Sequence, residues 1–201
     1  MHRTIILLIC LQVSLAGNSQ TNDITLLRDI YHNRNIQFDK PINILSESVK
    51  PISMVLPASL IIYGYFDKDI DTWDQGVRSA LSIGSAMAVT YTLKYTINRQ
   101  RPYERYLDII PLTDESTSSF PSGHTTAAFA TATTLTMLKP RWYVIIPAYG
   151  YAGMVAYSRM HLGMHYPSDV LMGALIGSGC SFASFKLNKL LKSGFLYPRK
   201  K

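Results

Sequence analysis

The stretch PSGHTTAAFATATTLTMLKPRWYVIIPAYGYAGMVAYSR, residues 121–159, decides the fold class of this chain. It holds two apolar segments, Ser122–Leu138 and Trp142–Tyr157, which are joined by the short basic turn Leu138–Arg141. Both segments are longer than ordinary strands, and their alanines and other small residues allow helices to pack closely. The stretch therefore predicts two helices connected by a tight turn.

Three further apolar segments flank this pair, and they run over Pro51–Phe66, Val77–Ile97 and Val170–Phe185. Length and composition favour helix over strand in each of them. We therefore expect an all-α helical bundle with about five transmembrane helices after an N-terminal signal segment. The mean hydropathy of +0.07 is low for such a protein, so the sequence does not exclude a helical bundle outside the membrane.

The composition of the 201-residue chain fits one folded domain rather than a disordered chain, because 47% of the residues are hydrophobic and only 16% are charged. The net charge of +7 would attract nucleic acid, anionic lipid or a phosphorylated substrate. The basic residues are scattered except at the C-terminus, which does not suit a nucleic-acid-binding module. We therefore expect no nucleic-acid partner and place the basic tail in the cytoplasm.

Residues 1–16 have the pattern of a secretory signal peptide. A basic start precedes the apolar run Ile5–Val13, and small residues suit cleavage after Ala16. The alternative is an uncleaved membrane helix, although the run is shorter than a span requires. Cleavage would remove Cys10 and leave Cys180 as the single cysteine, which excludes a zinc or redox site built on cysteines.

The rest of the chain divides into three parts. Residues 17–50 form a polar segment, in which a short amphipathic helix is expected from about Thr21 to Tyr31. Residues 51–188 contain the five apolar segments and form the predicted helical core. Residues 189–201 form the basic tail.

The charges between the apolar segments predict their orientation. The positive-inside rule places both the turn Leu138–Arg141 and the basic tail on the cytoplasmic side. The end of the second segment, the start of the third, the end of the fourth and the start of the fifth then share the outer side. These four ends carry the candidate functional residues, which are Lys94, Arg101, Ser122, Gly123, His124, Arg159, His165 and Asp169.

The cations among these residues suit a phosphoryl group. Arg101 and Arg159 can each bind phosphate oxygens through two parallel N–H groups, and Lys94 adds a point charge. Three positive charges match the negative charge that spreads over a phosphoryl group in its transition state. Ser122 and Gly123 precede a predicted helix, whose free N–H groups also favour an anion. We therefore predict that these five residues bind phosphate.

The two histidines can divide the acid and base work of phosphoryl transfer. His165 and Asp169 are four residues apart, so a helical start would bring them to one face. A carboxylate on one ring nitrogen fixes the tautomer and makes the other nitrogen more nucleophilic. We predict that His165 is the nucleophile that forms a phosphohistidine and that Asp169 orients it. His124 then protonates the leaving oxygen and later activates water.

These residues lie in three blocks that resemble the signature of the type 2 phosphatidic acid phosphatase superfamily. The blocks are Lys94 with Arg101-Pro102, then Pro121-Ser122-Gly123-His124, and finally Ser158-Arg159 with His165 and Asp169. The resemblance covers about residues 50–188, and the stretch before Pro51 adds little to it. It implies an all-helical phosphatase that needs no metal and no other cofactor.

The superfamily contains lipid phosphatases, soluble acid phosphatases and vanadium-dependent haloperoxidases, so membership leaves the substrate open. The chain resembles most the bacterial phosphatases of lipid A or undecaprenyl diphosphate, with phosphatidylglycerophosphate as a third candidate. We expect a bacterial inner-membrane enzyme with a periplasmic active site, and with the bilayer and a phosphorylated lipid as partners. The sequence predicts no oligomeric state. The alternatives are a soluble periplasmic acid phosphatase and a non-catalytic phosphate-binding membrane protein.

Overall fold

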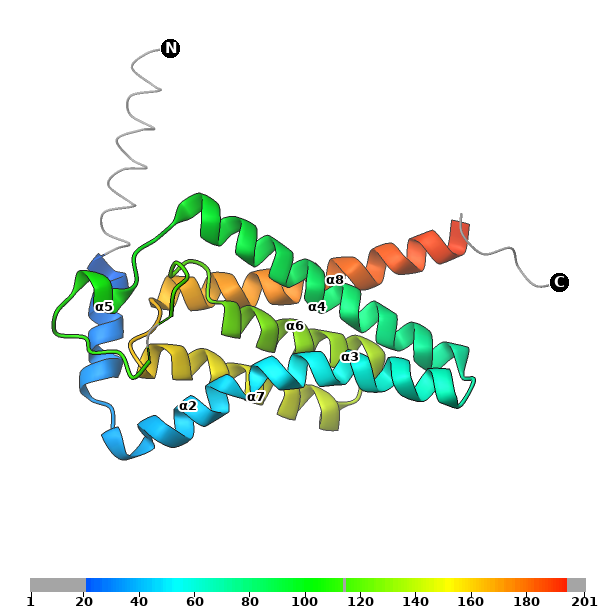
Figure 1. Ribbon diagram of the computed structural model, residues 1–201, viewed down its shortest axis with the longest axis horizontal. Coiled ribbons are helices and arrows are strands. Elements are labelled where there is room, and N and C mark those ends of the chain that lie inside the picture. Colours follow the sequence, from blue (N-terminus) through cyan, green and yellow to red (C-terminus); the bar gives the residue numbers. More distant parts are fainter. Residues whose placement is uncertain (1–20, 114, 195–201) are drawn as a thin grey trace, which may run out of the picture.

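The computed structural model describes residues 21–113 and 115–194, so the expected signal segment 1–16 and the end of the basic tail lie outside the described residues. Within these residues the chain forms helices and no strand, which confirms the all-α prediction (Figure 1). A helical segment over residues 21–32 is followed by η1 (Ile36–Phe38), α2 (Asp39–Glu47), α3 (Val49–Phe66), α4 (Ile70–Ile97), α5 (Pro102–Arg105), α6 (Gly123–Leu138), α7 (Trp142–His161) and α8 (Pro167–Gly194).

All five apolar segments are helices, and four of them extend beyond the predicted bounds, α4 and α8 by the most. Helix α4 begins at Ile70, ahead of its apolar segment, because Asp69 caps it. Asp69 Oδ1 accepts hydrogen bonds from the backbone N–H groups of Asp71 and Thr72 at 3.0 and 3.3 Å. Helix α8 continues to Gly194, so the first residues of the predicted tail are helical. The apolar pattern locates the helices, and local caps determine where they begin.

Helix α6 is central and packs against α3, α4, α7 and α8. Small and hydroxyl-bearing side chains form its buried faces, among them Thr125, Thr126, Ala128, Ala130 and Thr134. Hydroxyl groups pair between helices, since those of Ser82 and Thr134 lie 2.8 Å apart and Thr90 donates to Thr126 at 3.0 Å. These polar atoms of the core are therefore satisfied inside the bundle.

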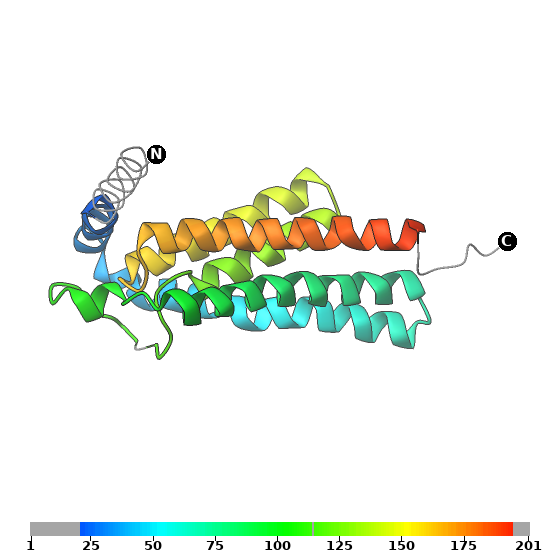
Figure 2. The same ribbon diagram turned by 90° about the horizontal axis from the view of Figure 1, so that it is seen from above.

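Two glycines let α8 run close alongside α6 (Figure 2). A Cβ atom on Gly173 would lie 2.7 Å from the Ser122 carbonyl oxygen, and one on Gly177 would lie 2.4 Å from the Thr126 carbonyl oxygen. Any side chain at these positions would push the two helices apart. The close approach also lets the backbone N–H of Ser122 donate to the carbonyl oxygen of Asp169 at 3.1 Å. The start of α6 is thereby fixed beside the start of α8.

The outer faces of the bundle are apolar. Large hydrophobic side chains are exposed along α3, α4, α7 and α8, among them Val55, Ile62, Leu81, Ile146, Met154, Leu171 and Phe182. Among the described residues, two stretches are long and apolar enough to cross a bilayer, namely Ile36–Phe66 and Pro167–Leu187. Hydroxyl groups that pair between helices inside the bundle and an apolar outer surface suit a lipid environment. The number of five spanning helices remains a prediction.

The N-terminal part of the chain packs on one end of this bundle (Figure 1). A buried cluster joins the helical segment 21–32 to the core through Ile24, Leu27, Tyr31, Ile109 and Tyr166. The Tyr31 hydroxyl donates to the Ile110 carbonyl oxygen at 2.9 Å and accepts from the Ile110 N–H at 3.0 Å. The stretch before Pro51, which carries none of the motif blocks, therefore contributes to the buried core at this end.

The four helix ends that carry the motif residues lie together at this same end of the bundle, as the charge pattern predicts (Figure 1). The loop between α3 and α4, residues 67–69, and the basic turn Leu138–Arg141 lie away from it. The grouping of the four ends is therefore confirmed. Their placement on the periplasmic side remains a prediction.

Candidate active site

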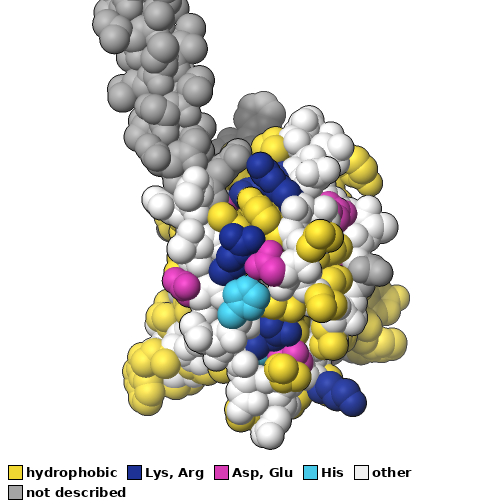
Figure 3. Space-filling model, turned by 90° about the vertical axis from the view of Figure 1, so that its left-hand side faces the viewer, with side chains coloured by type: hydrophobic (Ala, Val, Ile, Leu, Met, Phe, Trp, Pro, Cys, Tyr) yellow, Lys and Arg dark blue, Asp and Glu magenta, His cyan; other side chains and the backbone are white. Residues whose placement is uncertain are grey.

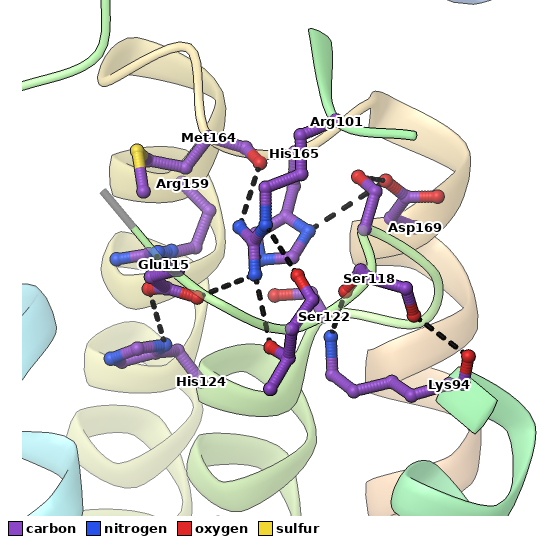
Figure 4. A network of polar contacts seen from close by, with 12 residues as sticks. Lys94, Arg101, Glu115, Ser118, Ser122, His124, Arg159, Met164, His165 and Asp169 are labelled. Carbon is purple, nitrogen blue, oxygen red and sulfur yellow. Dashed lines mark hydrogen bonds and ion pairs between the residues drawn. The ribbon is translucent and has the colours of Figure 1, made fainter. Parts of the chain in front are cut away.

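The side chains predicted from the motifs form one network of polar contacts (Figure 4). Each is buried and comes from a helix end or the turn beside it: Lys94 from α4, Arg101 before α5, Ser122 and His124 at the start of α6, Arg159 from α7, His165 before α8 and Asp169 in α8. At the surface of this end, charged side chains lie among hydrophobic ones (Figure 3). The polar network therefore lies below a mixed surface.

A tight turn after α7 brings His165 next to Arg159. Gly163 has a φ of +68°, a left-handed backbone conformation that favours glycine. The backbone N–H groups of Met164 and His165 then both donate to the carbonyl oxygen of Arg159, at 3.0 and 3.3 Å. The spacing of the third motif block thus corresponds to one closed turn.

The guanidinium groups of Arg101 and Arg159 converge on a space that we call the anion position. The carboxylate of Glu115, from the loop before α6, lies in it and accepts from Arg101 Nη2 at 2.6 Å and from Arg159 Nη2 at 2.5 Å. Burial would raise the pKa of Glu115, but the charges of Arg159 and Arg101 outweigh it and lower the pKa to about 2. The two guanidinium groups thus hold one carboxylate between them, an arrangement that suits an anion.

The loop that carries Glu115 is tied to the predicted cations. Lys94 Nζ donates to the carbonyl oxygen of Ser118, and Ser118 Oγ donates to the carbonyl oxygen of Lys94 at 2.8 Å. Arg101 Nε donates to the Thr117 carbonyl oxygen at 2.8 Å. Sequence reasoning missed this loop, for which the available signal was a run of polar residues between two motif blocks.

His165 is buried, and each ring nitrogen has a different neighbour. Nε2 lies 3.3 Å from Arg101 Nη1, beside the anion position. Nδ1 lies 3.6 Å from Asp169 Oδ2, which is an ion-pair distance and too long for a hydrogen bond. Burial, followed by the charges of Arg101 and Arg159, holds the pKa of His165 well below its usual range. The imidazole is therefore neutral and keeps the lone pair that a nucleophile needs.

Asp169 is held by three donors that the sequence analysis did not single out. Arg99 Nη1 donates to Oδ1 at 2.6 Å, Ser119 Oγ to Oδ2 at 2.5 Å, and the backbone N–H of Tyr166 to Oδ2 at 3.1 Å. These bonds fix the carboxylate on the Nδ1 side of His165. This placement fits the orienting role predicted for Asp169.

Arg99 also joins Asp169 to the N-terminal helical segment. Its Nη2 donates to Asp23 Oδ2 at 2.7 Å. Asp23 binds the start of α8 as well, because its carboxylate accepts from the backbone N–H of Ser168 at 2.8 Å and from the Ser168 hydroxyl at 2.5 Å. The Arg99 guanidinium group therefore pairs with two buried carboxylates, those of Asp169 and Asp23. Through Asp23, the segment before Pro51 contacts the polar network of the site.

Replacing Arg99 with methionine is expected to destabilise the folded protein. The variant leaves the carboxylates of Asp169 and Asp23 buried without their cation, and breaking a buried pair of this kind costs about 3 kcal/mol. Thermal unfolding in detergent measures the change. Arg105→Met, which removes an arginine outside this network, is the control. An unchanged Tm for Arg99→Met would contradict the view that Arg99 stabilises the fold through its pairs with Asp169 and Asp23.

His124 also borders the anion position. Its Nδ1 lies 3.8 Å from Glu115 Oε1, and its Nε2 lies 3.0 Å from Oε1 of Glu47 at the end of α2. An anion held where the Glu115 carboxylate lies therefore has the imidazole rings of both His124 and His165 close by (Figure 4). Such an arrangement can bind an anion, attack it with one ring and exchange a proton with the other.

Ser122 and Gly123 form the start of α6, as predicted. Ser122 Oγ caps the helix and accepts a hydrogen bond from the Thr125 hydroxyl at 3.0 Å. A Cβ atom on Gly123 would lie 3.9 Å from Lys94 Cε, so this helix start faces the lysine side chain. The Ser122 side chain thus serves the helix, and its part in phosphate binding remains a prediction.

Three side chains of the site could hold a divalent cation. Ligand atoms of Glu47, Glu115 and His124 lie within 4.8 Å of one another. Both carboxylates are already paired with cations, Glu47 with Lys50 at 2.6 Å and Glu115 with the two arginines. This pairing weakens their attraction for a metal ion. Removal of metals with EDTA tests whether the activity depends on one.

A cavity of about 530 Å³ opens beside His124 and Lys94. Its walls come from α3, α4 and α6, and their apolar members include Val49, Met54, Ile83, Met87 and Ala127. Glu115 and Gly123 line it as well, close to the anion position. The site therefore combines a polar end that suits an anion with an apolar extension between helices.

Comparison with known proteins identifies related sequences. The sequence model of the PAP2 superfamily matches residues 75–192, which is more than half of the chain. An undecaprenyl-diphosphatase of Sulfolobus acidocaldarius is 33% identical over 113 residues, 56% of this chain and 54% of the relative. Phosphatidylglycerophosphatase B of Bacillus subtilis is 31% identical over 141 residues, 66% of this chain and 64% of the relative. The chain thus spans between about half and two thirds of these curated relatives.

A solved structure has a similar fold. The crystal structure of a transmembrane PAP2-type phosphatidylglycerolphosphate phosphatase from Bacillus subtilis matches with a TM-score of 0.72, over 98% of this chain and 100% of that chain. At 24% sequence identity this likeness shows the fold alone. The helical bundle is therefore one that a membrane protein also adopts.

Proposed function

The chain belongs to the PAP2 superfamily, and from this premise we propose that it hydrolyses the phosphate of a membrane lipid through a phosphohistidine formed on His165. The observation that carries the proposal is the anion position, where a carboxylate lies between two buried guanidinium groups with two imidazole rings close by. A phosphoryl group held in the same way has a nucleophile and a proton donor within reach.

In the first step, His165 Nε2 attacks the phosphorus atom, so that a P–N bond forms and the bond to the leaving oxygen breaks. His124 gives its proton to the leaving oxygen. Asp169 stabilises the positive charge that develops on the His165 ring. In the second step, His124 takes a proton from water, the water oxygen attacks phosphorus, and the P–N bond breaks. Inorganic phosphate then leaves, and both rings return to their starting state.

The positive charges stabilise both transition states. Arg101 and Arg159 hold phosphoryl oxygens where the Glu115 carboxylate lies in the free protein. Lys94 adds a third charge from the end of α4. Donors that are fixed before the reaction starts are worth most in a site with little water.

Two features favour a lipid over a soluble phosphate ester as the substrate. The cavity beside His124 continues between α3, α4 and α6 along apolar side chains, which suits the chain of a lipid. The outer faces of the helices are apolar, which suits a bilayer. We propose lipid A, undecaprenyl diphosphate or phosphatidylglycerophosphate as the substrate, and the periplasmic side of a bacterial inner membrane as the location. The low mean hydropathy of +0.07 favours the soluble acid phosphatase as the second candidate.

Phosphate release from four substrates tests the proposal. The protein, purified in detergent, is assayed with lipid A, undecaprenyl diphosphate, phosphatidylglycerophosphate and p-nitrophenyl phosphate. A strong preference for one lipid is the expected result and would name the substrate. Similar turnover of all four, with activity in detergent-free soluble extract, would favour the soluble acid phosphatase. Phosphate binding without any turnover would mean a non-catalytic phosphate-binding protein.

Removal of metals with EDTA is expected to leave the activity unchanged, and vanadate is expected to inhibit it. The charges of Arg101, Arg159 and Lys94 supply the stabilisation that a metal gives in other phosphatases. Vanadate takes up the trigonal-bipyramidal shape of the transition state and should bind tightly. Phosphate release with and without each reagent measures both effects. Strong inhibition by EDTA that an added metal reverses would overturn the metal-independent mechanism.

A further inference from the structure

His124 has a carboxylate partner that lies outside the three motif blocks. Glu47, the last residue of α2, places Oε1 3.0 Å from His124 Nε2. An ionised carboxylate only accepts, so Nε2 carries the hydrogen of this bond. The other ring nitrogen, Nδ1, lies 3.8 Å from Glu115 Oε1 in the anion position. The ring therefore directs one nitrogen at the reacting group and the other at Glu47.

We propose that Glu47 is a positioning residue for His124, whose tautomer and ring orientation it fixes and whose doubly protonated form it stabilises. The inference rests on the proposed function, in which His124 is the general acid. When the leaving oxygen departs, the proton on Nδ1 moves to it and the Nε2–H stays bonded to Glu47. When water attacks the phosphohistidine, Nδ1 takes a proton back. Glu47 thus does for His124 what Asp169 does for His165.

The two oxygens of Glu47 have different partners. Lys50 Nζ lies 2.6 Å from Oε2, whereas Oε1 lies 3.0 Å from His124 Nε2 and 3.9 Å from Arg159 Nη1. The pair with Lys50 is exposed, and pairs of that kind contribute little to stability. The bond to the buried His124 is therefore the stronger reason for a carboxylate at this position.

The backbone around Glu47 is anchored on both sides. The hydroxyl of Ser46 accepts a hydrogen bond from Arg159 Nη1 at 2.9 Å. The hydroxyl of Ser48 lies 2.7 Å from that of Tyr151 in α7. These contacts hold the junction of α2 and α3 against the site, so the half-exposed carboxylate has a fixed position relative to His124.

The test compares two substrates that differ in how much the leaving oxygen needs a proton. p-Nitrophenolate leaves readily without one, whereas an alkoxide does not, so a damaged general acid slows an alkyl phosphate far more. The ratio kcat/KM is measured because it covers only the steps up to departure of the leaving group. Glu47→Gln is expected to lower kcat/KM about 10- to 100-fold on decyl phosphate and less than about threefold on p-nitrophenyl phosphate.

Four further variants give the comparison its reference points. His124→Ala should show the same dependence on the leaving group with a larger loss, and adding Glu47→Gln to it should cause no further loss. Glu47→Asp, which keeps the charge, should restore part of the activity. Asp108→Asn is the matched control. Asp108 also pairs with a histidine, His32 at 3.2 Å, but at the surface, so the ratio between the two substrates should stay unchanged.

The possible outcomes separate this inference from the proposed function. If Glu47→Gln causes an equal loss on both substrates or none, while His124→Ala keeps its dependence, the role of Glu47 is overturned and the proposed function stands. If His124→Ala itself causes an equal loss on both substrates, the acid role fails and the inference fails with it. A lowered Tm of Glu47→Gln that accompanies equal losses would mean that Glu47 has a structural role only.

Discussion

Replacing His165 with alanine is expected to abolish both phosphate release and covalent labelling of the chain. The substitution removes the nitrogen that bonds to phosphorus, and loss of a nucleophile lowers kcat by about 10⁴-fold or more. His165 suits this role because it is buried beside Arg101, where burial and the charges of Arg101 and Arg159 hold its pKa well below the usual range. Its ring is therefore neutral at neutral pH and has a lone pair available for the proposed attack.

Trapping with a radiolabelled substrate measures this effect. The reaction is quenched in base, because phosphohistidine survives base and is lost in acid. His32→Ala is the matched control, since His32 lies at the surface and bonds to Asp108, and it should keep both activity and label. A normal amount of acid-labile phosphoprotein from His165→Ala would remove the assignment of the nucleophile.

Arg101→Lys is expected to lower kcat/KM by about 10²- to 10³-fold although it keeps the positive charge. The guanidinium group donates through Nε to Thr117 at 2.8 Å, and through Nη1 to the Met164 carbonyl oxygen at 3.1 Å. These two bonds aim Nη2 at the anion position, where it meets Glu115 at 2.6 Å. A lysine ammonium group cannot reproduce this planar fork. The phosphoryl group would therefore lose both a donor and its alignment.

Steady-state kinetics on the preferred substrate measures the loss in Arg101→Lys. Vanadate inhibition gives a second measure, because a damaged anion position must also bind vanadate less tightly. Arg105→Lys is the control: Arg105 lies over the Tyr106 ring, outside the network, and its replacement should change neither quantity. A loss of less than about tenfold in Arg101→Lys would contradict the importance of the fork.

The helices and the motif side chains could be predicted because both follow from local patterns. Helix α6 coincides with its apolar segment and begins directly after the Ser122 cap. The spacing between Arg159 and His165 corresponds to a turn that a single glycine, Gly163, allows. The early start of α4 was not predictable from hydropathy, since it depends on a cap by Asp69 in a polar loop.

The partners of the motif side chains could not be predicted, because they come from segments far apart in the sequence. Glu47 meets His124, and Asp23 meets Arg99, only in the folded chain. Neither carboxylate lies in an apolar pattern or in a motif block, so nothing in its local sequence distinguishes it from a solvated surface charge. Glu115 could not be predicted for the same reason, although it lies at the centre of the site.

The Glu115 carboxylate is an internal anion that already occupies the two arginines of the site. With a pKa of about 2 it stays ionised at any physiological pH, and it competes with every incoming anion for Arg101 and Arg159. In the proposed reaction, substrate binding then replaces one anion by another, and its free energy is the difference between two sets of contacts. The proposal implies the reverse exchange after hydrolysis, with the carboxylate taking the place of inorganic phosphate, so that the two buried cations keep a counter-ion.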